Sequence, residues 1–160
     1  MAKPFPWKAA ISAGIVAGLV FMLLEMALVG TIGGQSPWGP PRMIAAIAMG
    51  DGVLPPPATF DLGIVMVAMI VHFALSMILG VIFGWAISRR PMTLTVAIIA
   101  GIILGLAVYV LGFYILTPIF PWFAMARGGI SIFAHAVFGL TLGLAYYAMA
   151  SRQPSAGAVE

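Results

Sequence analysis

The chain has 160 residues, of which 63% are hydrophobic and 7% are charged, and its mean hydropathy is +1.17. This composition leaves too little polar surface for a water-soluble globule, and the absence of cysteine excludes disulfides and thiolate metal sites. The net charge of +3 comes from dispersed basic residues, which does not fit a nucleic-acid-binding patch. We therefore predict a protein of the lipid bilayer.

Four apolar segments, residues 9–31, 62–87, 92–116 and 130–150, are each long enough to cross about 30 Å of hydrocarbon as a helix rising about 1.5 Å per residue. A backbone surrounded by lipid must satisfy its own hydrogen bonds, so we predict an all-α polytopic protein with one transmembrane domain, residues 1–160. The first segment is too long for the apolar region of a signal peptide and contains Glu25. We expect it to remain in the mature protein.

The connection between the first two segments, residues 32–61, contains "GPPRMIAAIAMGDG". Turn residues at both ends of this stretch predict a short helix at residues 42–49, interpreted as a cap over the helix bundle. Trp38 and Trp122 lie in the two outer loops, where aromatic residues commonly anchor a chain at the lipid headgroups. Residues 153–160 are predicted to form a disordered tail.

The basic residues indicate the orientation of the chain in the membrane. Cytoplasmic loops carry an excess of lysine and arginine, and an even number of spans puts both termini on one side. The side with both termini would hold five basic residues and the other side two: Lys3, Lys8, Arg89, Arg90 and Arg152 against Arg42 and Arg127. We therefore predict that both termini are cytoplasmic.

The chain also shows an internal repeat. The second and fourth segments align with His135 over His72 and Gly143 over Gly80, and "AGIVAGL" in the first segment matches "AGIILGL" in the third. Each half would be a helical hairpin in the same orientation, so the predicted fold is a four-helix bundle of two parallel repeats.

Each predicted helix carries one hydrogen-bonding side chain on the same face as its small residues, which is the face expected to pack inward. These side chains are Glu25, His72, Tyr109 and His135, each seventeen to nineteen residues from a cytoplasmic charge. We predict that they form a polar layer inside the bundle, near its outer surface.

Ionisable groups inside membrane helices are candidates for a functional site. A purely structural interpretation pairs Glu25 with Arg42 or Arg127 and leaves the two histidines as neutral hydrogen-bonding groups. A relay of protons or ions within a transport module is an alternative, and unchanged flux in proteoliposomes of Glu25→Gln would contradict it.

Two cofactor alternatives use the histidines. In the first, His72 and His135 are the axial ligands of a b-type haem in an electron-transfer protein, with small residues leaving room for the porphyrin. In the second, Glu25, His72, His135 and Tyr109 hold a transition metal. An absorption spectrum with metal analysis of protein from its native membrane separates these alternatives from an empty cluster.

The stretches "FMLLEMALVG", "WGPPRMIAAIAMG", "VHFALSMILGVIFGW", "FPWF" and "FAHAVFGLTLGL" resemble a family of small four-span bacterial membrane proteins, sometimes loosely labelled as symporters. The resemblance covers residues 14–147 and implies a location in the bacterial inner membrane. Four spans are far fewer than sodium–solute symporters have, so we do not predict symport.

The small size of the chain and its lack of extramembrane domains favour a non-enzymatic role. We predict an accessory or assembly subunit of a larger inner-membrane complex, in contact with the lipid bilayer and with other subunits or further copies of itself.

Overall fold

The computed structural model describes residues 5–88 and 92–152; the predicted tail at residues 153–160 lies outside these described residues. The described residues form five α-helices, with no strand among them: α1 (Trp7–Thr31), α2 (Gly39–Met49), α3 (Leu62–Ile87), α4 (Leu94–Val110) and α5 (Gly129–Ala150). Three short helical turns complete the order: η1 (Asp51–Val53) after α2, η2 (Leu111–Ile115) after α4, and η3 (Pro121–Ala126) before α5. Four helices are long and apolar enough to cross a membrane, namely α1, α3, α4 extended by η2, and α5.

The ends of the helices follow local sequence chemistry. The cap helix α2 begins at Gly39, three residues before the predicted start, because Pro40 and Pro41 fit the first helical turn, where a missing N–H costs nothing. Asp61 caps α3 and Thr93 caps α4, each by accepting a hydrogen bond from a backbone N–H three residues further on (2.9 Å and 3.2 Å). The four predicted spans agree with the observed helices to within a few residues.

One departure from the prediction lies in the third span. Its last turn, η2, is a π-helix containing Gly112, followed by a loop that leads to η3. The wider turn changes which carbonyl groups bond within the helix, and the Phe113 carbonyl accepts a hydrogen bond from Nε of Arg127 (2.6 Å). Apolar periodicity alone does not reveal such a turn.

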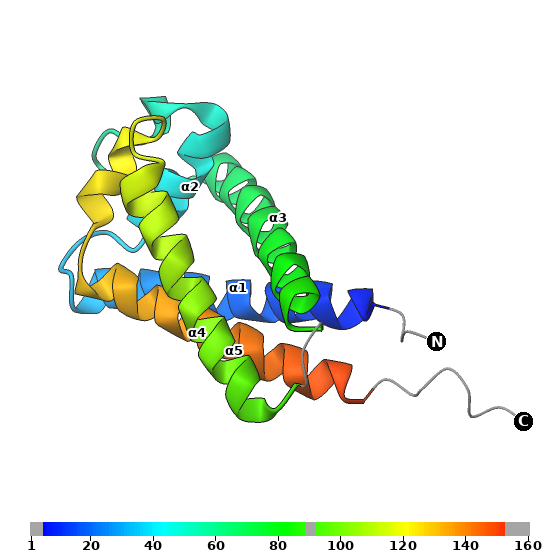
Figure 1. Ribbon diagram of the computed structural model, residues 1–160. Helices are drawn as coiled ribbons and strands as arrows, with labels where there is room; N and C mark the ends of the chain where they lie inside the picture. Colours follow the sequence, from blue (N-terminus) through cyan, green and yellow to red (C-terminus); the bar gives the residue numbers. More distant parts are fainter. Residues whose placement is uncertain (1–4, 89–91, 153–160) are drawn as a thin grey trace, which may run out of the picture.

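The helices are arranged in two crossing layers (Figure 1). α1 and α5 pack side by side, α3 packs across α1, and α4 packs across α5, whereas α3 and α4 touch each other little. The short helix α2 packs against α3. The arrangement therefore has a continuous α1/α5 layer and two separate helices above it.

The crossing of α1 and α3 brings two helix backbones into contact. A Cβ atom added to Gly14 would collide with the Ser76 carbonyl, and one added to Gly80 would collide with the Ala10 carbonyl. Lipid tails are as apolar as the side chains, so helix association in a bilayer depends on close packing of this kind. The glycines are required here by contact, not by a special backbone conformation.

The crossing of α4 and α5 is built in the same way. A Cβ atom on Gly101 would meet the Gly139 carbonyl, and one on Gly143 would meet the Ala97 carbonyl. Added side chains on either helix would force the two backbones apart.

The buried apolar core fills the half of the structure that contains the first turns of α1. It consists of small residues from α1 and α4 and larger side chains from α3 and α5: Ala9, Ala10, Ala13, Ala17, Ala97, Phe83, Ile87, Phe138, Leu142 and Tyr146. The Tyr146 hydroxyl donates to the Gly84 carbonyl (3.3 Å), which ties α5 to α3. The core therefore binds the helices together at this end of the structure.

Gly139→Ala tests the backbone crossing. The added methyl group meets the Gly101 carbonyl, so we expect a loss of about 1–3 kcal/mol in the free energy of unfolding, as for other overpacked sites. Unfolding in mixed detergent micelles with increasing dodecyl sulfate, followed by circular dichroism, measures the change. Gly112→Ala is the matched control, because a Cβ atom there meets nothing within 4 Å; equal stability of the two variants would contradict the prediction.

Candidate functional site

A cavity of about 710 Å³ lies between α3 and α4, above the α1/α5 layer and next to α2. Glu25, His72 and His135 all line it. Tyr109 is buried beside His135, with ring centroids 5.6 Å apart, but does not line the cavity. Three of the four residues of the predicted polar layer therefore line the same cavity, and the fourth packs against one of them.

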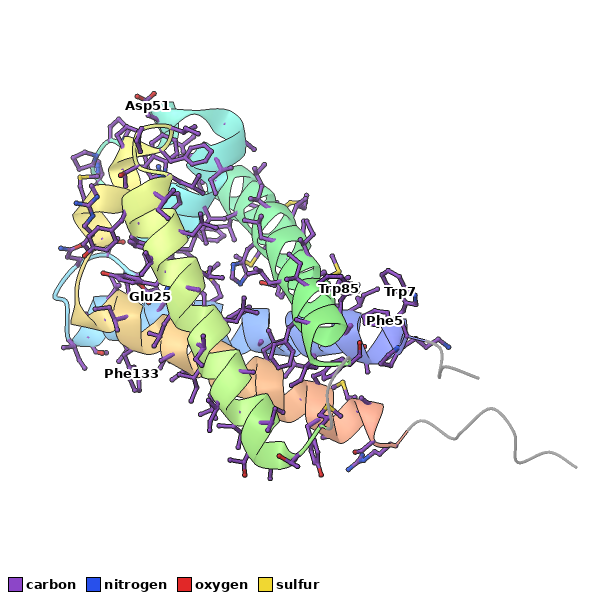
Figure 2. All side chains as sticks on the ribbon, viewed as in Figure 1. Phe5, Trp7, Glu25, Asp51, Trp85 and Phe133 are labelled. Carbon is purple, nitrogen blue, oxygen red and sulfur yellow. The ribbon has the colours of Figure 1, made fainter. Side chains whose placement is uncertain are left out.

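Glu25 lies toward the end of α1 that is remote from Phe5 and Trp7 (Figure 2). Its side chain is only 5% exposed, and its Oε1 atom accepts a hydrogen bond from the Ser131 hydroxyl of α5 (2.7 Å). Its Oε2 atom has no hydrogen-bond partner among the described residues. A buried polar atom without a partner is costly, and is a reason to look for a missing ligand.

His72 is held by the backbone of α1. Its Nε2–H donates to the Gly18 carbonyl (2.8 Å). A Cβ atom on Gly18 would lie 3.3 Å from this nitrogen and 2.6 Å from the Ser76 hydroxyl oxygen, so the missing side chain of Gly18 makes room for both residues. The same glycine therefore supplies the hydrogen-bond acceptor and the space for the imidazole.

His135 is held by its own helix. Its Nδ1–H donates to the Ser131 carbonyl one turn earlier (2.7 Å). Ser131 thus binds two members of the site, Glu25 through its hydroxyl and His135 through its carbonyl. The ring of Phe21 packs against both imidazoles, stacked with His72 at 5.7 Å and edge-on to His135 at 4.7 Å.

These hydrogen bonds determine which imidazole nitrogens are available to a ligand. A carbonyl oxygen only accepts, so the nitrogen facing it must carry the hydrogen, and in a neutral imidazole the other nitrogen is then a lone-pair acceptor. The remaining acceptors are Nδ1 of His72 and Nε2 of His135. Together with the Glu25 carboxylate they make the polar part of the cavity rich in acceptors.

The predicted ion pair of Glu25 with Arg42 or Arg127 is absent among the contacts of the described residues. The Arg42 guanidinium donates instead to the carbonyls of Thr59 (3.0 Å) and Val53 (2.7 Å), which fastens the loop after α2. The reason is that both partners of Arg42 lie in the irregular segment between α2 and α3, whose carbonyls need donors.

Arg127 lines the cavity but is also engaged elsewhere. Besides bonding the Phe113 carbonyl, it donates to the Thr117 hydroxyl (3.3 Å) and lies over the Tyr114 ring at 4.4 Å from its centroid. The irregular turn at the end of α4 supplies all these partners.

The predicted metal centre is not assembled. Within residues 5–88 and 92–152, no three histidine, cysteine, aspartate or glutamate side chains lie close enough together to hold one metal ion. Glu25 and His135 are joined through Ser131, and both imidazoles pack against Phe21, so an apolar ring occupies the space beside the predicted ligands His72 and His135. Tyr109, the fourth predicted ligand, faces its neighbours Phe113 and His135.

The contacts of His72 also do not favour a bis-histidine haem. Its Nε2 atom is bonded to Gly18, so an iron bound there would have to replace that bond. The haem interpretation remains a prediction, for which the absorption spectrum is the test.

One side of the cavity is covered by α2, which contributes Met43, Ile44 and Ile47. Trp122, predicted as an anchor at the headgroups, is instead 9% exposed, and its indole N–H donates to the Met43 carbonyl (3.0 Å). The packing of η3 against the cap accounts for this difference. Trp38 contacts Phe60 in the loop.

The sequence analysis missed the roles of Ser131 and Phe21. The signal for Ser131 was its position four residues before His135, where a helical neighbour shares the same face. Phe21 lies four residues before Glu25 in an unbroken apolar run, and nothing in its local sequence distinguishes it from a residue that faces lipid.

No family model, curated protein or solved structure matches this chain. The assignment of the site therefore rests on the geometry of its residues.

Ser131→Ala tests the support of Glu25. Removal of the hydroxyl leaves Oε1 of Glu25, like Oε2, without a hydrogen-bond partner among the described residues. We therefore expect a loss of about 1–3 kcal/mol in the free energy of unfolding. The same variant in a Glu25→Leu background should lose much less, because the carboxyl group is already gone. Chemical unfolding of the four proteins of this double-mutant cycle measures the coupling, and additive effects would show that the two side chains do not interact.

Proposed function

We propose that this protein binds an amphipathic molecule taken from the bilayer, with its polar group near Glu25 and its apolar part between α3 and α4. The observation that carries the proposal is the composition of one cavity: apolar walls on two helices long enough to span a membrane, with a small group of buried polar side chains among them. Ligand sites in proteins commonly combine an apolar lining with a few oriented polar groups, and this volume is within their usual range of about 300–1,000 Å³.

The proposed entrance is between α3 and α4. Leu75 and Ile78 on α3 and Leu111 at the end of α4 line the cavity and are nevertheless 46%, 55% and 44% exposed. In a bilayer, this exposed surface faces acyl chains. A molecule dissolved in the membrane therefore reaches the cavity without crossing a polar barrier.

We further propose that the chain is a duplicated hairpin with both termini in the cytoplasm. The duplication is supported by matching contacts: Gly14 meets Ser76 as Gly101 meets Gly139, and each pair holds the same positions in the sequence alignment. The orientation is supported by the distribution of basic residues. Because the chain has no cysteine, labelling of Ser151→Cys and Asp51→Cys with a membrane-impermeant maleimide tests the orientation directly.

The role of an accessory subunit of a larger inner-membrane complex is our second proposal. Its support is the same uncovered space between α3 and α4, which a helix of a neighbouring subunit would also fit. Migration as a free monomer on native gels after mild extraction from the source membrane would contradict it.

Gly112→Leu tests binding in the cavity. Gly112 lines the cavity and a Cβ atom there meets nothing within 4 Å, so a leucine side chain would occupy ligand space without a backbone collision. We expect saturable binding of radiolabelled dodecanol to protein in phosphatidylcholine nanodiscs to weaken by about tenfold or more. The leucine side chain takes the place of apolar contacts with the ligand, and the loss of about 1.4 kcal/mol of binding free energy is a factor of ten in affinity.

Gly52→Leu is the matched control, because Gly52 also has open space around it but lies in η1, outside the cavity. Its dodecanol binding should equal that of the original protein. Equal saturable binding of dodecanol to the original protein and to Gly112→Leu would overturn the proposed function.

A further inference from the structure

Glu25, His72 and His135 offer a ligand of the cavity hydrogen-bond acceptors. Oε2 of Glu25 has no hydrogen-bond partner within residues 5–88 and 92–152, and the imidazole N–H groups of His72 and His135 are both directed to backbone carbonyls. On these three residues the groups left for a ligand are a carboxylate oxygen and two imidazole lone pairs, and the Ser76 hydroxyl lines the cavity as well. A ligand whose polar group only accepts hydrogen bonds would leave all three unsatisfied.

The site also lacks a positive charge close to its carboxylate. Glu25 is the only acidic residue in the four long helices, since Asp51 and Asp61 precede α3 and Glu160 ends the chain. The Arg127 guanidinium, which belongs to the cavity lining, is held by Phe113, Thr117 and Tyr114, and among the described residues Glu25 makes no ion pair. A buried carboxylate is stable only when it is paired, so a cationic ligand complements this site.

Aromatic rings form another part of the cavity lining. Phe21, Phe113 and Phe138 line the same cavity, and Phe21 packs against both imidazoles. The faces of aromatic rings attract organic cations, and more strongly where water is excluded. The lining thus favours an organic cation over a hydrated metal ion.

From these observations we propose that the ligand of the cavity is a lipophilic amine in its protonated form. Its N–H groups donate to Glu25 and to an imidazole lone pair of His72 or His135, and its apolar chain leaves between α3 and α4. This assignment rests on the proposed function and names the chemical class of its ligand. Phosphate and carboxylate head groups are disfavoured, because they add negative charge and acceptors to a site that already has both.

Four probes with the same alkyl chain separate charge from hydrogen bonding. Dodecylamine is a cation with N–H donors, since alkylamines of the lysine type have a pKa of about 10.4. Dodecyltrimethylammonium is a cation without donors, dodecanol a neutral donor, and dodecanoate an anion. Saturable binding of each radiolabelled probe is measured at pH 7 on the whole protein in phosphatidylcholine nanodiscs, with protein-free nanodiscs as the blank.

We expect dodecylamine to bind about tenfold or more tightly than dodecanol and dodecanoate, as charge-assisted hydrogen bonds require, and dodecyltrimethylammonium to bind at an intermediate level. Glu25→Gln preserves an oxygen that can accept from Ser131 but removes the charge, so it should abolish the preference for the amine. Asp51→Asn removes one exposed acidic charge outside the cavity and should leave the preference unchanged.

Equal binding of the amine and dodecanoate, or a preference for the amine that survives in Glu25→Gln, would overturn this inference. Equal binding of the two cations would contradict its hydrogen-bonding part. If all four probes bind alike and Gly112→Leu weakens each of them, the ligand class is wrong but the proposed binding function stands. If no probe binds saturably, the proposed function itself fails.

Discussion

The close contact of helix backbones at two crossings determines the rest of this structure. α3 rests on α1 at Gly14 and Ser76, and α4 rests on α5 at Gly101 and Gly139. In a bilayer the apolar side chains gain little by leaving lipid, so the dense packing of small residues carries the association. Because α3 packs on α1 and α4 packs on α5, α3 and α4 have little contact with each other. The space between them remains as a cavity.

The polar groups in that cavity are held in place by hydrogen bonds within the chain. Gly18 fixes one imidazole through its carbonyl, and Ser131 fixes the carboxyl group of Glu25 and the second imidazole together. Groups already held in place lose little freedom when a ligand binds, which is the usual basis of affinity from preorganisation. One oxygen of the buried Glu25 carboxyl group has no hydrogen-bond partner among the described residues. The unfavourable free energy of burying it would be offset by a ligand that donates a hydrogen bond to it.

The sequence predicted much of this fold because a lipid environment leaves few choices. Apolar length gave the four long helices, and the spacing of small residues indicated the inward faces, including those of His72 and His135. The partners of Arg42 and Arg127 were not predictable, because they are carbonyls of irregular loop and π-helical backbone, which carry no side-chain signal. The separation of α3 from α4 depends on the relative tilt of whole helices, which residue spacing within one helix does not encode.

The hydrogen bond from Trp122 to the Met43 carbonyl joins parts of the chain that are distant in sequence. Trp122 lies in η3, just before α5, whereas Met43 belongs to the cap helix α2, which follows α1. The hydrogen bond therefore ties the segment before α5 to α2. Outward movement of α2 would break this bond and expose an indole N–H and a carbonyl at once. The cap helix is therefore held over the cavity by a bond whose loss would leave two polar groups unpaired.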